Sequence, residues 1–241
     1  MIFAVKVNNL VKVFGNVRAL NGVTFSIKQG EIYGLIGPNG AGKTTTLRIL
    51  ATLIKPTSGK AEVFGYDVVK DAEKLRKIIS YLPEDAGVYK HLTGYEYLEF
   101  MARFTKASKE EVKAMVKEAA ALSGLGDRLK DKVKTYSKGM KRRLLVARAL
   151  MVKPKLAILD EPTSGLDVMH AFHIRNIIKE YAHRYGMTVI LSSHNMLEVD
   201  YLCDRIGIIH LGKIIIEGKP SELKSRYEAS NLEEVFAKVV S

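Results

Sequence analysis

The chain has 241 residues, of which 47% are hydrophobic and 27% charged. This balance excludes an intrinsically disordered protein and allows a sizeable buried core. No stretch reaches the roughly 18 consecutive apolar residues of a membrane-spanning helix; the run over 206–216 is interrupted by His210 and Lys213. The first ten residues have neither a basic start nor a long apolar run, so we expect no secretory signal and a soluble, intracellular protein.

The charge balance favours anionic partners. There are 38 basic and 26 acidic residues, a formal net charge of +12. Such a surplus suits nucleotides, nucleic acid or the anionic face of a membrane, and composition does not choose among them. The single cysteine, Cys203, excludes an internal disulfide and fits a reducing compartment.

Short runs rich in β-branched residues open the chain and predict strands. They are Val5–Val7, Val23–Ile27, Ile32–Ile36, Ala61–Phe64 and, as a further buried strand, Ile78–Leu82. Gly15–Asn16 and Gln29–Gly30 supply turns between the early strands. After Ile36 the pattern changes to a helical one that begins near Lys43.

The middle of the chain has helical patterns. Thr93 with Glu96, and Ser108 with Glu111, have the spacing of a capping box, so each pair is expected to open a helix. A third helix is expected from about Lys138 to the proline at 154. We therefore expect a helical subdomain over about 86–153, inserted between strands.

Strand patterns then return and alternate with helical ones. The expected strands are Leu156–Leu159, Thr188–Leu191, Ile206–His210 and Lys213–Ile216. Continuous apolar runs between helices predict a parallel sheet that is covered on both faces. The expected fold is a single α/β domain over 1–241, with a mainly parallel sheet, an antiparallel β-rich N-terminal edge and the inserted helical subdomain.

A phosphate-binding loop follows the strand Ile32–Ile36. The pattern G-x-x-x-x-G-K-[ST] is matched by Gly37, Pro38, Asn39, Gly40, Ala41, Gly42, Lys43, Thr44 and Thr45. Glycines let successive backbone N–H groups point inward, which makes a cradle for phosphate at a helix N-terminus. Lys43 would supply charge to the β- and γ-phosphates, and the Thr44 hydroxyl would ligate Mg²⁺.

Two carboxylates end the apolar strand Leu156–Leu159. Asp160 at the strand tip would hold Mg²⁺ through water, and Glu161 beside it would polarise an attacking water. Adjacent acids repel one another unless a cation or a proton is part of the site. A strand followed by Asp-Glu is weak evidence alone, but it becomes strong downstream of a phosphate loop in one α/β core.

At this point the chain resembles an ATP-binding subunit of the ABC (ATP-binding cassette) family over about 4–218, with a short C-terminal extension over 219–241. Tyr136-Ser137-Lys138-Gly139-Met140 lies where the family has its signature, and Ser164-Gly165-Leu166-Asp167 matches its S-G-L-D turn. A histidine after the next strand, His194, and an aromatic residue before the first turn, Phe14, also match. The resemblance implies that Phe14 stacks on adenine and that His194 holds the γ-phosphate.

The resemblance also implies a partner and cofactors. In this family two cassettes meet head to tail and sandwich two ATP molecules, each between the phosphate loop of one chain and the signature of the other. Ser137 and the Gly139 N–H lie at a helix N-terminus, which suits an anion. The basic residues there are Lys138, Lys141, Arg142 and Arg143. They are explained either by a partner's triphosphate or by solvated side chains.

Two departures from the family pattern stand out. Met140 replaces the glutamine that ends the usual signature, which alters contacts to the ribose or across the dimer. Glu84 lies where the family usually has a glutamine that touches Mg²⁺ and the membrane subunit. A carboxylate binds this hard cation at least as well as an amide. Exporters of the drug-resistance type tolerate the acid, which resembles the present case.

Some residues keep two interpretations. His170 and His173 are three apart on one helix face, a spacing that could hold a metal, but a solvated or core role is favoured. The aromatic residues of the helical insertion either pack in its core or form a docking groove for a helix of a membrane partner. They are Tyr95, Tyr97, Phe100 and Phe104.

The leading functional hypothesis is the ATP-hydrolysing subunit of a membrane transporter, and an exporter in particular. It would act as a homodimer or with a related cassette, on separate transmembrane permease subunits, at the cytoplasmic face of the membrane, with ATP and Mg²⁺ and without nucleic acid. An alternative is a soluble ABC ATPase acting on ribosomes, nucleic acid or iron–sulfur assembly. A small phosphate-loop kinase would leave the signature, the S-G-L-D turn and His194 unexplained.

Overall fold

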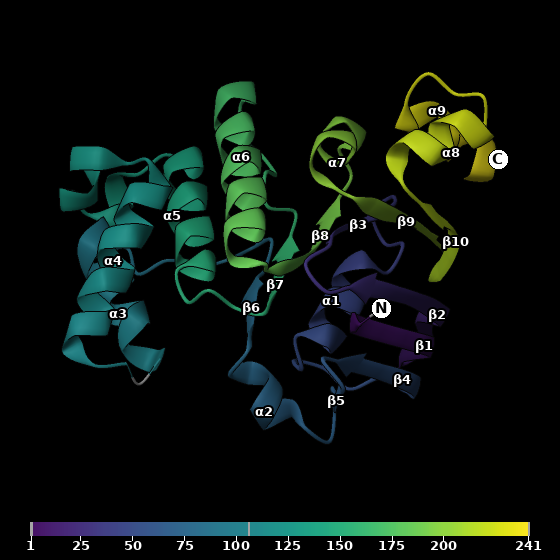
Figure 1. Cartoon of the computed structure of the whole chain (residues 1–241), viewed down its shortest axis with the longest axis horizontal. Helices are drawn as coiled ribbons and strands as arrows, with labels where there is room; N and C mark the ends of the chain where they lie inside the picture. Colours follow the sequence, from purple (N-terminus) through teal and green to yellow (C-terminus); the bar gives the residue numbers. More distant parts are fainter. Residues whose placement is uncertain (1, 106, 241) are drawn as a thin grey trace.

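The computed structural model describes residues 2–105 and 107–240, and its centre is a six-stranded sheet (Figure 1). The strands lie in the order β10 (Lys213–Gly218), β9 (Arg205–His210), β3 (Ile32–Ile36), β8 (Thr188–Ser193), β7 (Leu156–Asp160) and β6 (Ile79–Leu82). All neighbours are parallel except β10, which pairs antiparallel with β9. The expected mainly parallel sheet is confirmed.

The N-terminal strands form a second, antiparallel sheet rather than an edge of the central one. Its order is β2 (Val17–Lys28), β1 (Phe3–Phe14), β4 (Ser58–Val63) and β5 (Tyr66–Asp67). Gly15 and Asn16 make the turn between β1 and β2, with Gly15 at φ 54°. Both strands run for 12 residues, well beyond the apolar runs that predict them, because hairpin pairing also recruits polar neighbours.

The central sheet buries both of its faces. Alternate residues of a strand point to opposite sides. Ile158 and Ile190 therefore pack in one core with α1 (Lys43–Leu50) and the antiparallel sheet. Leu159 and Leu191 pack in the other. The first core lies between the two sheets. Helix α1 therefore packs against side chains of both sheets, and this fixes the loop that precedes it.

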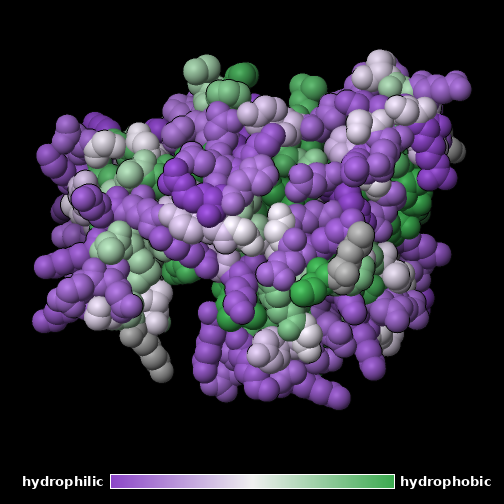
Figure 2. Space-filling view, in the orientation of Figure 1, coloured by the Kyte–Doolittle hydropathy of each residue, from purple (hydrophilic) through white to green (hydrophobic). Residues whose placement is uncertain are grey.

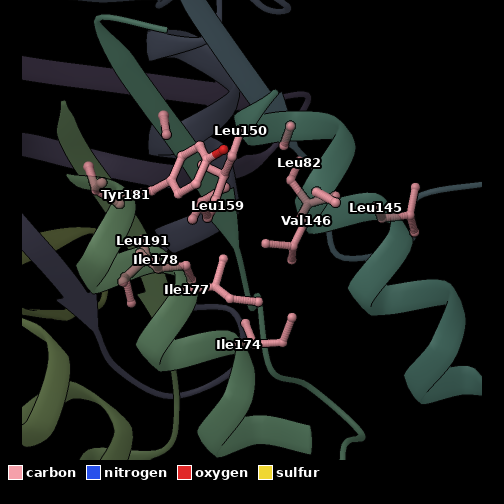
Figure 3. Close-up of a cluster of buried hydrophobic side chains, with 14 of the residues drawn as sticks. Leu82, Leu145, Val146, Leu150, Leu159, Ile174, Ile177, Ile178, Tyr181 and Leu191 are labelled. Carbon is pink, nitrogen blue, oxygen red and sulfur yellow. The ribbon is translucent and has the colours of Figure 1, made fainter. Parts of the chain in front are cut away.

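The second core joins the sheet to helices on its other face. Figure 3 shows Val146 of α5 (Lys138–Leu150) and Ile174 of α6 (Val168–Tyr185) among the side chains that meet Leu159 of β7 and Leu191 of β8. Each of these side chains is fully buried. Helix α7 (Met196–Leu202) follows β8 and packs against the same face of the sheet.

Between β6 and β7 the described residues form helices and 3₁₀ turns. They are α3 (Gly94–Ala102), η1 (Arg103–Thr105), α4 (Lys109–Ser123), η2 (Gly126–Lys130), η3 (Val133–Thr135) and α5. Both predicted capping boxes are confirmed: Thr93 opens α3 and Ser108 opens α4, each with reciprocal bonds to the glutamate three residues later. We call this part, 94–150, the helical segment.

A polar cluster ties the helical segment to α6. Glu118 of α4 accepts hydrogen bonds from the hydroxyls of Tyr181 and Tyr185 and pairs with Lys153 at 2.8 Å. Burial alone raises the pKa of Glu118, but these three donors outweigh it and lower the pKa to about 2. The carboxylate is therefore ionised at neutral pH, and it bonds two side chains of α6 and one from the connection between α5 and β7.

The remaining helices complete the surface. Helix α2 (Ala72–Arg76) precedes β6, while α8 (Pro220–Arg226) and α9 (Leu232–Val240) lie beside α7, with Leu232 and Val235 buried. Within the part of the chain that the structure describes, no helix is both long enough and apolar enough to span a bilayer.

Candidate active site

The phosphate loop runs from the end of β3 to the start of α1, as the sequence predicts. A side chain at Gly37 would collide with the Ile209 carbonyl. Gly42 has φ 111°, and a Cβ there would lie 2.6 Å from Leu20. Only glycine fits both positions, so neighbouring strands hold the loop in the wound shape that directs its backbone N–H groups inward.

Lys43, the first residue of α1, is buried with its ammonium inside this loop. Its Nζ donates to the carbonyls of Gly37 at 2.6 Å and Pro38 at 3.2 Å. The same nitrogen lies 3.7 Å from Glu161 Oε1, and both side chains are nearly inaccessible to solvent. The cation therefore stands between the phosphate loop and the end of β7.

Asp160 ends β7, and three hydroxyl groups donate hydrogen bonds to its carboxylate. Oδ1 accepts from Thr44 Oγ1 at 3.2 Å and from Ser192 Oγ at 2.6 Å, while Oδ2 accepts from the Tyr81 hydroxyl at 3.3 Å. The Thr44 hydroxyl and the Asp160 carboxylate form an adjacent pair of hard oxygen donors, the kind that Mg²⁺ prefers. Their arrangement fits a magnesium site. Glu84, the third predicted ligand, lies on the loop after β6 with an exposed side chain.

Tyr81 and Ser192 belong to this site, but the sequence pattern does not single them out. Burial, and after it the Asp160 charge, raises the pKa of Tyr81 to about 12, so its hydroxyl stays a donor at neutral pH. Ser192 is opposite Asp160 in the β7–β8 register. A polar residue at the end of an apolar strand is the available signal for Ser192, but which strands are neighbours is not written locally in the sequence.

Glu161 and His194 meet beside Lys43. His194, on the loop after β8, has Nδ1 2.8 Å from Glu161 Oε2. The Glu161 backbone is left-handed, with φ 48°, a conformation that costs energy for any residue except glycine. Its N–H donates to Ser192 Oγ at 2.9 Å, which helps to hold that conformation. The structure thus brings together the three predicted catalytic residues.

The signature residues lie at the start of α5, in the helical segment and away from the phosphate loop (Figure 1). Ser137 is the N-cap, and its hydroxyl accepts from the Met140 N–H at 3.2 Å. Lys138 and Ser137 are exposed, but Arg142 is buried and turns inward. Neither interpretation of the basic residues holds for Arg142: its guanidinium faces neither a partner's triphosphate nor solvent, because it is buried and donates to carbonyls of its own chain.

Phe14, the proposed adenine platform, is the last residue of β1 and is half exposed. Lys12 Nζ lies 4.8 Å from the centre of its ring. A flat, accessible aromatic face beside a cation suits an aromatic anion such as a nucleotide.

Two features define a phosphate-loop NTPase. One is the strand β3 followed by a glycine loop and a helix that starts with Lys43; the other is the Asp-Glu pair at the end of β7, which is separated from β3 by β8. Comparison with known proteins makes the class narrower. A model of the ABC transporter family matches residues 20–164. With the relatives described below, this shows that the chain belongs to the ABC transporter ATP-binding family, whose members are ATPases that bind ATP with Mg²⁺.

Similar proteins include antibiotic-resistance ATP-binding proteins. The linearmycin resistance ATP-binding protein LnrL of Bacillus subtilis (strain 168) is 42% identical over 90% of this chain and 70% of its own length. The daunorubicin/doxorubicin resistance ATP-binding protein DrrA of Streptomyces peucetius is 41% identical over 92% of this chain and 67% of its own length.

Solved structures agree. An ATP-binding subunit of an ABC transporter superposes with a TM-score of 0.88 and 28% identity, over 99% of this chain and 100% of its own. A dimeric ATP-binding cassette in a post-hydrolysis state, bound to ADP and phosphate, gives a TM-score of 0.81 and 29% identity over 89% of this chain and 98% of its own.

Proposed function

We propose that this chain is the ATP-hydrolysing subunit of a membrane exporter and that Glu161 is its general base. The observation that carries the proposal is the convergence of Lys43, Glu161 and His194 at the carboxyl ends of β3, β7 and β8. In open parallel sheets, ligands bind beyond the carboxyl ends of the strands. These contacts bring a cation, a carboxylate and an imidazole together, which supports a shared role of the three at one phosphate.

Each residue has a separate part in an in-line attack on the γ-phosphate. Glu161 orients and deprotonates the water, and His194, bonded to the same carboxylate, holds a γ-phosphate oxygen. Lys43 neutralises charge on the β- and γ-phosphates. Mg²⁺, held by Thr44, by Asp160 through water and by Glu84, would supply further charge neutralisation on the phosphates.

The binding site for the rest of the nucleotide uses both chains of a pair. The phosphate loop over 37–45 would bind the phosphates and Phe14 the adenine, while Ser137 and Gly139 of a partner copy would cap the γ-phosphate from the N-terminus of α5. Ser137 is exposed, as this role requires. A homodimer and a pair with a related cassette both satisfy the geometry.

Exposed apolar residues support pairing on the same face. Val168 and Met169 at the start of α6, and Leu197 in the first turn of α7, are 79%, 75% and 67% exposed. Figure 2 shows hydrophobic residues projecting at the ends of these helices, above an otherwise largely hydrophilic surface. Because α6 and α7 begin where β7 and β8 end, this face is also that of the active site. A second copy would cover them.

The names of the relatives support an export role. Two of them are ATP-binding proteins of resistance to linearmycin and to daunorubicin/doxorubicin. A soluble role on ribosomes, nucleic acid or iron–sulfur assembly is not favoured by these names. We therefore place the chain at the cytoplasmic face of a membrane, bound to permease subunits that are separate polypeptides.

A groove at the edge of the helical segment suits such a permease. It has a volume of ≈ 410 Å³ and is lined by Pro83, Ala86, Val88, Tyr89, Met101 and Arg148. Phe100 packs edge-on against both Tyr89 and Phe104, and all three rings are exposed. Tyr97 also lines this groove, but its side chain is almost fully buried in the core. We propose that a cytoplasmic helix of the permease docks on these three rings, next to the loop that carries Glu84.

The assignment of Glu161 is tested with Glu161→Gln. The amide has nearly the same shape but cannot accept the proton, so we expect equilibrium ATP binding within about threefold of the parent and turnover at least a hundredfold lower. Glu180→Gln, at an exposed carboxylate paired with Arg184, is the matched control and should leave both quantities unchanged. Turnover at the parental rate in Glu161→Gln would refute the base.

A further inference from the structure

Arg142 is a buried cation whose hydrogen bonds all go to backbone carbonyls of two loops in the active site. It lies in α5, five residues after Ser137, and is 6% exposed. Nε donates to the Pro162 carbonyl at 2.9 Å. Nη1 donates to Pro83 at 3.1 Å and Glu84 at 3.0 Å, and Nη2 to Asp160 at 2.7 Å and to Glu161.

This arrangement uses the full donor capacity of a guanidinium. The group carries five N–H donors in a fixed planar fork, and here it makes five bonds. Burial lowers the pKa of Arg142, while the nearby charges of Asp160, Glu84 and Glu161 act in the opposite direction. A lysine ammonium, as a point charge with three donors, cannot span the same carbonyls.

Two of these carbonyls belong to Glu161 and Glu84, residues whose backbone position determines where their carboxylates lie in the proposed site. Glu161 has the left-handed backbone described above, with φ 48°. Ser192 holds its N–H side, and Arg142 holds its carbonyl side. The same guanidinium holds the carbonyl of Glu84, so one side chain connects the signature helix, the loop of Glu161 and the loop of Glu84.

We propose that Arg142 is a positioning residue for hydrolysis: it fixes the backbone of Glu161, and with it the carboxylate, to the helix whose N-terminus meets the partner's ATP. The proposal rests on the role of Glu161 proposed above. A shift of α5 when a partner's nucleotide binds would therefore be transmitted directly to Glu161 and Glu84 of the same chain. Arg142 does not itself touch the nucleotide.

The test separates chemistry from binding in Arg142→Met, with Arg142→Lys as a milder second variant. A misplacement of about 1 Å in a catalytic group can cost about a hundredfold in rate. We expect kcat to fall about a hundredfold in Arg142→Met and by a smaller factor in Arg142→Lys. The equilibrium dissociation constant for ATP should stay within about threefold, because Lys43 and the phosphate loop are intact.

The matched control is Arg205→Met. Arg205 is also largely buried and bonds Glu31 and Glu217. It lies at the start of β9 and pairs with Tyr33 at the start of β3, whereas the phosphate loop follows the other end of β3. We expect its kcat and ATP affinity to stay within about threefold of the parent. An equal loss of kcat in both arginine variants would show a general loss of rigidity and would overturn the proposal.

Two further outcomes also overturn the inference: an unchanged kcat in Arg142→Met, or a parallel loss of kcat and ATP affinity in both Arg142 variants that retain the parental circular dichroism. If Arg142→Met does not fold, Arg142→Lys decides alone. Failure of the proposed function is distinguishable, since it would appear as full turnover in Glu161→Gln. If Glu161→Gln loses turnover while the Arg142 variants keep full turnover, only the positioning role of Arg142 is contradicted.

Discussion

Asp160 and Glu161 are adjacent, yet their carboxylates lie in different surroundings. Three hydroxyl groups, from Thr44, Ser192 and Tyr81, hold Asp160. Glu161 instead faces Lys43 and His194, and its left-handed backbone turns it away from its neighbour. Because the Glu161 backbone is left-handed, the Asp160 carboxylate is in surroundings that suit binding of a metal ion, and the Glu161 carboxylate is in surroundings that suit activation of a water molecule.

Lys43 gives the first test at the scale of one residue. A hydrogen bond to a charged group contributes about 1.5–3 kcal/mol, so Lys43→Ala should weaken ATP binding by about one to two orders of magnitude. Turnover should fall as well, because we propose that the same ammonium neutralises charge on the γ-phosphate. Titration with a fluorescent ATP analogue measures the affinity, and Lys113→Ala, at an exposed position of α4 in the helical segment, tests the effect of losing a cation elsewhere.

At the scale of elements, Glu118 is the polar connection between α4 and α6. Its bonds to Tyr181, Tyr185 and Lys153 are the reason that its pKa lies at about 2. The apolar contacts in Figure 3 add to this connection through α5 and α6. An apolar contact surface, the Glu118 carboxylate and the Arg142 guanidinium therefore all attach the helical segment to the rest of the fold.

Glu118→Gln should lower the free energy of unfolding by about 1–3 kcal/mol at pH 7, because a charged acceptor is lost from three donors. The folded pKa is depressed from the reference value of 4.5 to about 2. The carboxylate therefore stabilises the fold fully above pH 4.5, and this contribution is lost as the pH falls towards 2. In denaturant titrations, the difference in the free energy of unfolding between parent and variant should therefore become smaller as the pH falls from 4.5 towards 2.

The exposed pair Glu180 and Arg184 on α6 gives the control. Glu180→Gln should change the free energy of unfolding by less than about 1 kcal/mol at every pH, since surface ion pairs contribute little. A Glu118→Gln effect no larger than this would remove Glu118 as the connection between the two elements.

The aromatic rings of α3 and η1 give a second test at this scale. Phe104 is 69% exposed and packs edge-on against Phe100. Phe104→Asp should leave the ATPase of the isolated chain within about twofold. If the rings dock a permease helix, the fraction of the chain that sediments with host membranes should fall at least tenfold, as for a central interface residue.

Ile215→Asp, on β10 at the far end of the molecule, is the matched change of an exposed apolar residue and should keep membrane association. Equal sedimentation of Phe104→Asp and Ile215→Asp would contradict docking at the rings.

At the scale of the whole molecule, local patterns predicted the elements, while the site depends on contacts between distant segments. The glycine loop and the capping boxes at Thr93 and Ser108 are local, and they were predicted. The separate N-terminal sheet depends on which strands pair, which no local pattern states. Arg142 was misjudged because the four basic residues between 138 and 143 look alike in sequence, whereas the fold buries one of them.

The active-site residues follow the same division. Lys43, Asp160 and Glu161 were found because a motif or a strand end marks them. Tyr81 and Ser192 reach Asp160 across neighbouring strands, so their role follows from strand order alone.

The central claim is that ATP bound by the phosphate loop of one copy is capped by the α5 N-terminus of another, so that ATP closes the pair and hydrolysis opens it. The most direct test is sedimentation velocity of Glu161→Gln with and without saturating ATP and Mg²⁺. We expect monomers without nucleotide and dimers with it, and monomers again when Ser137→Arg blocks the helix end. Monomeric Glu161→Gln at saturating ATP would contradict the claim.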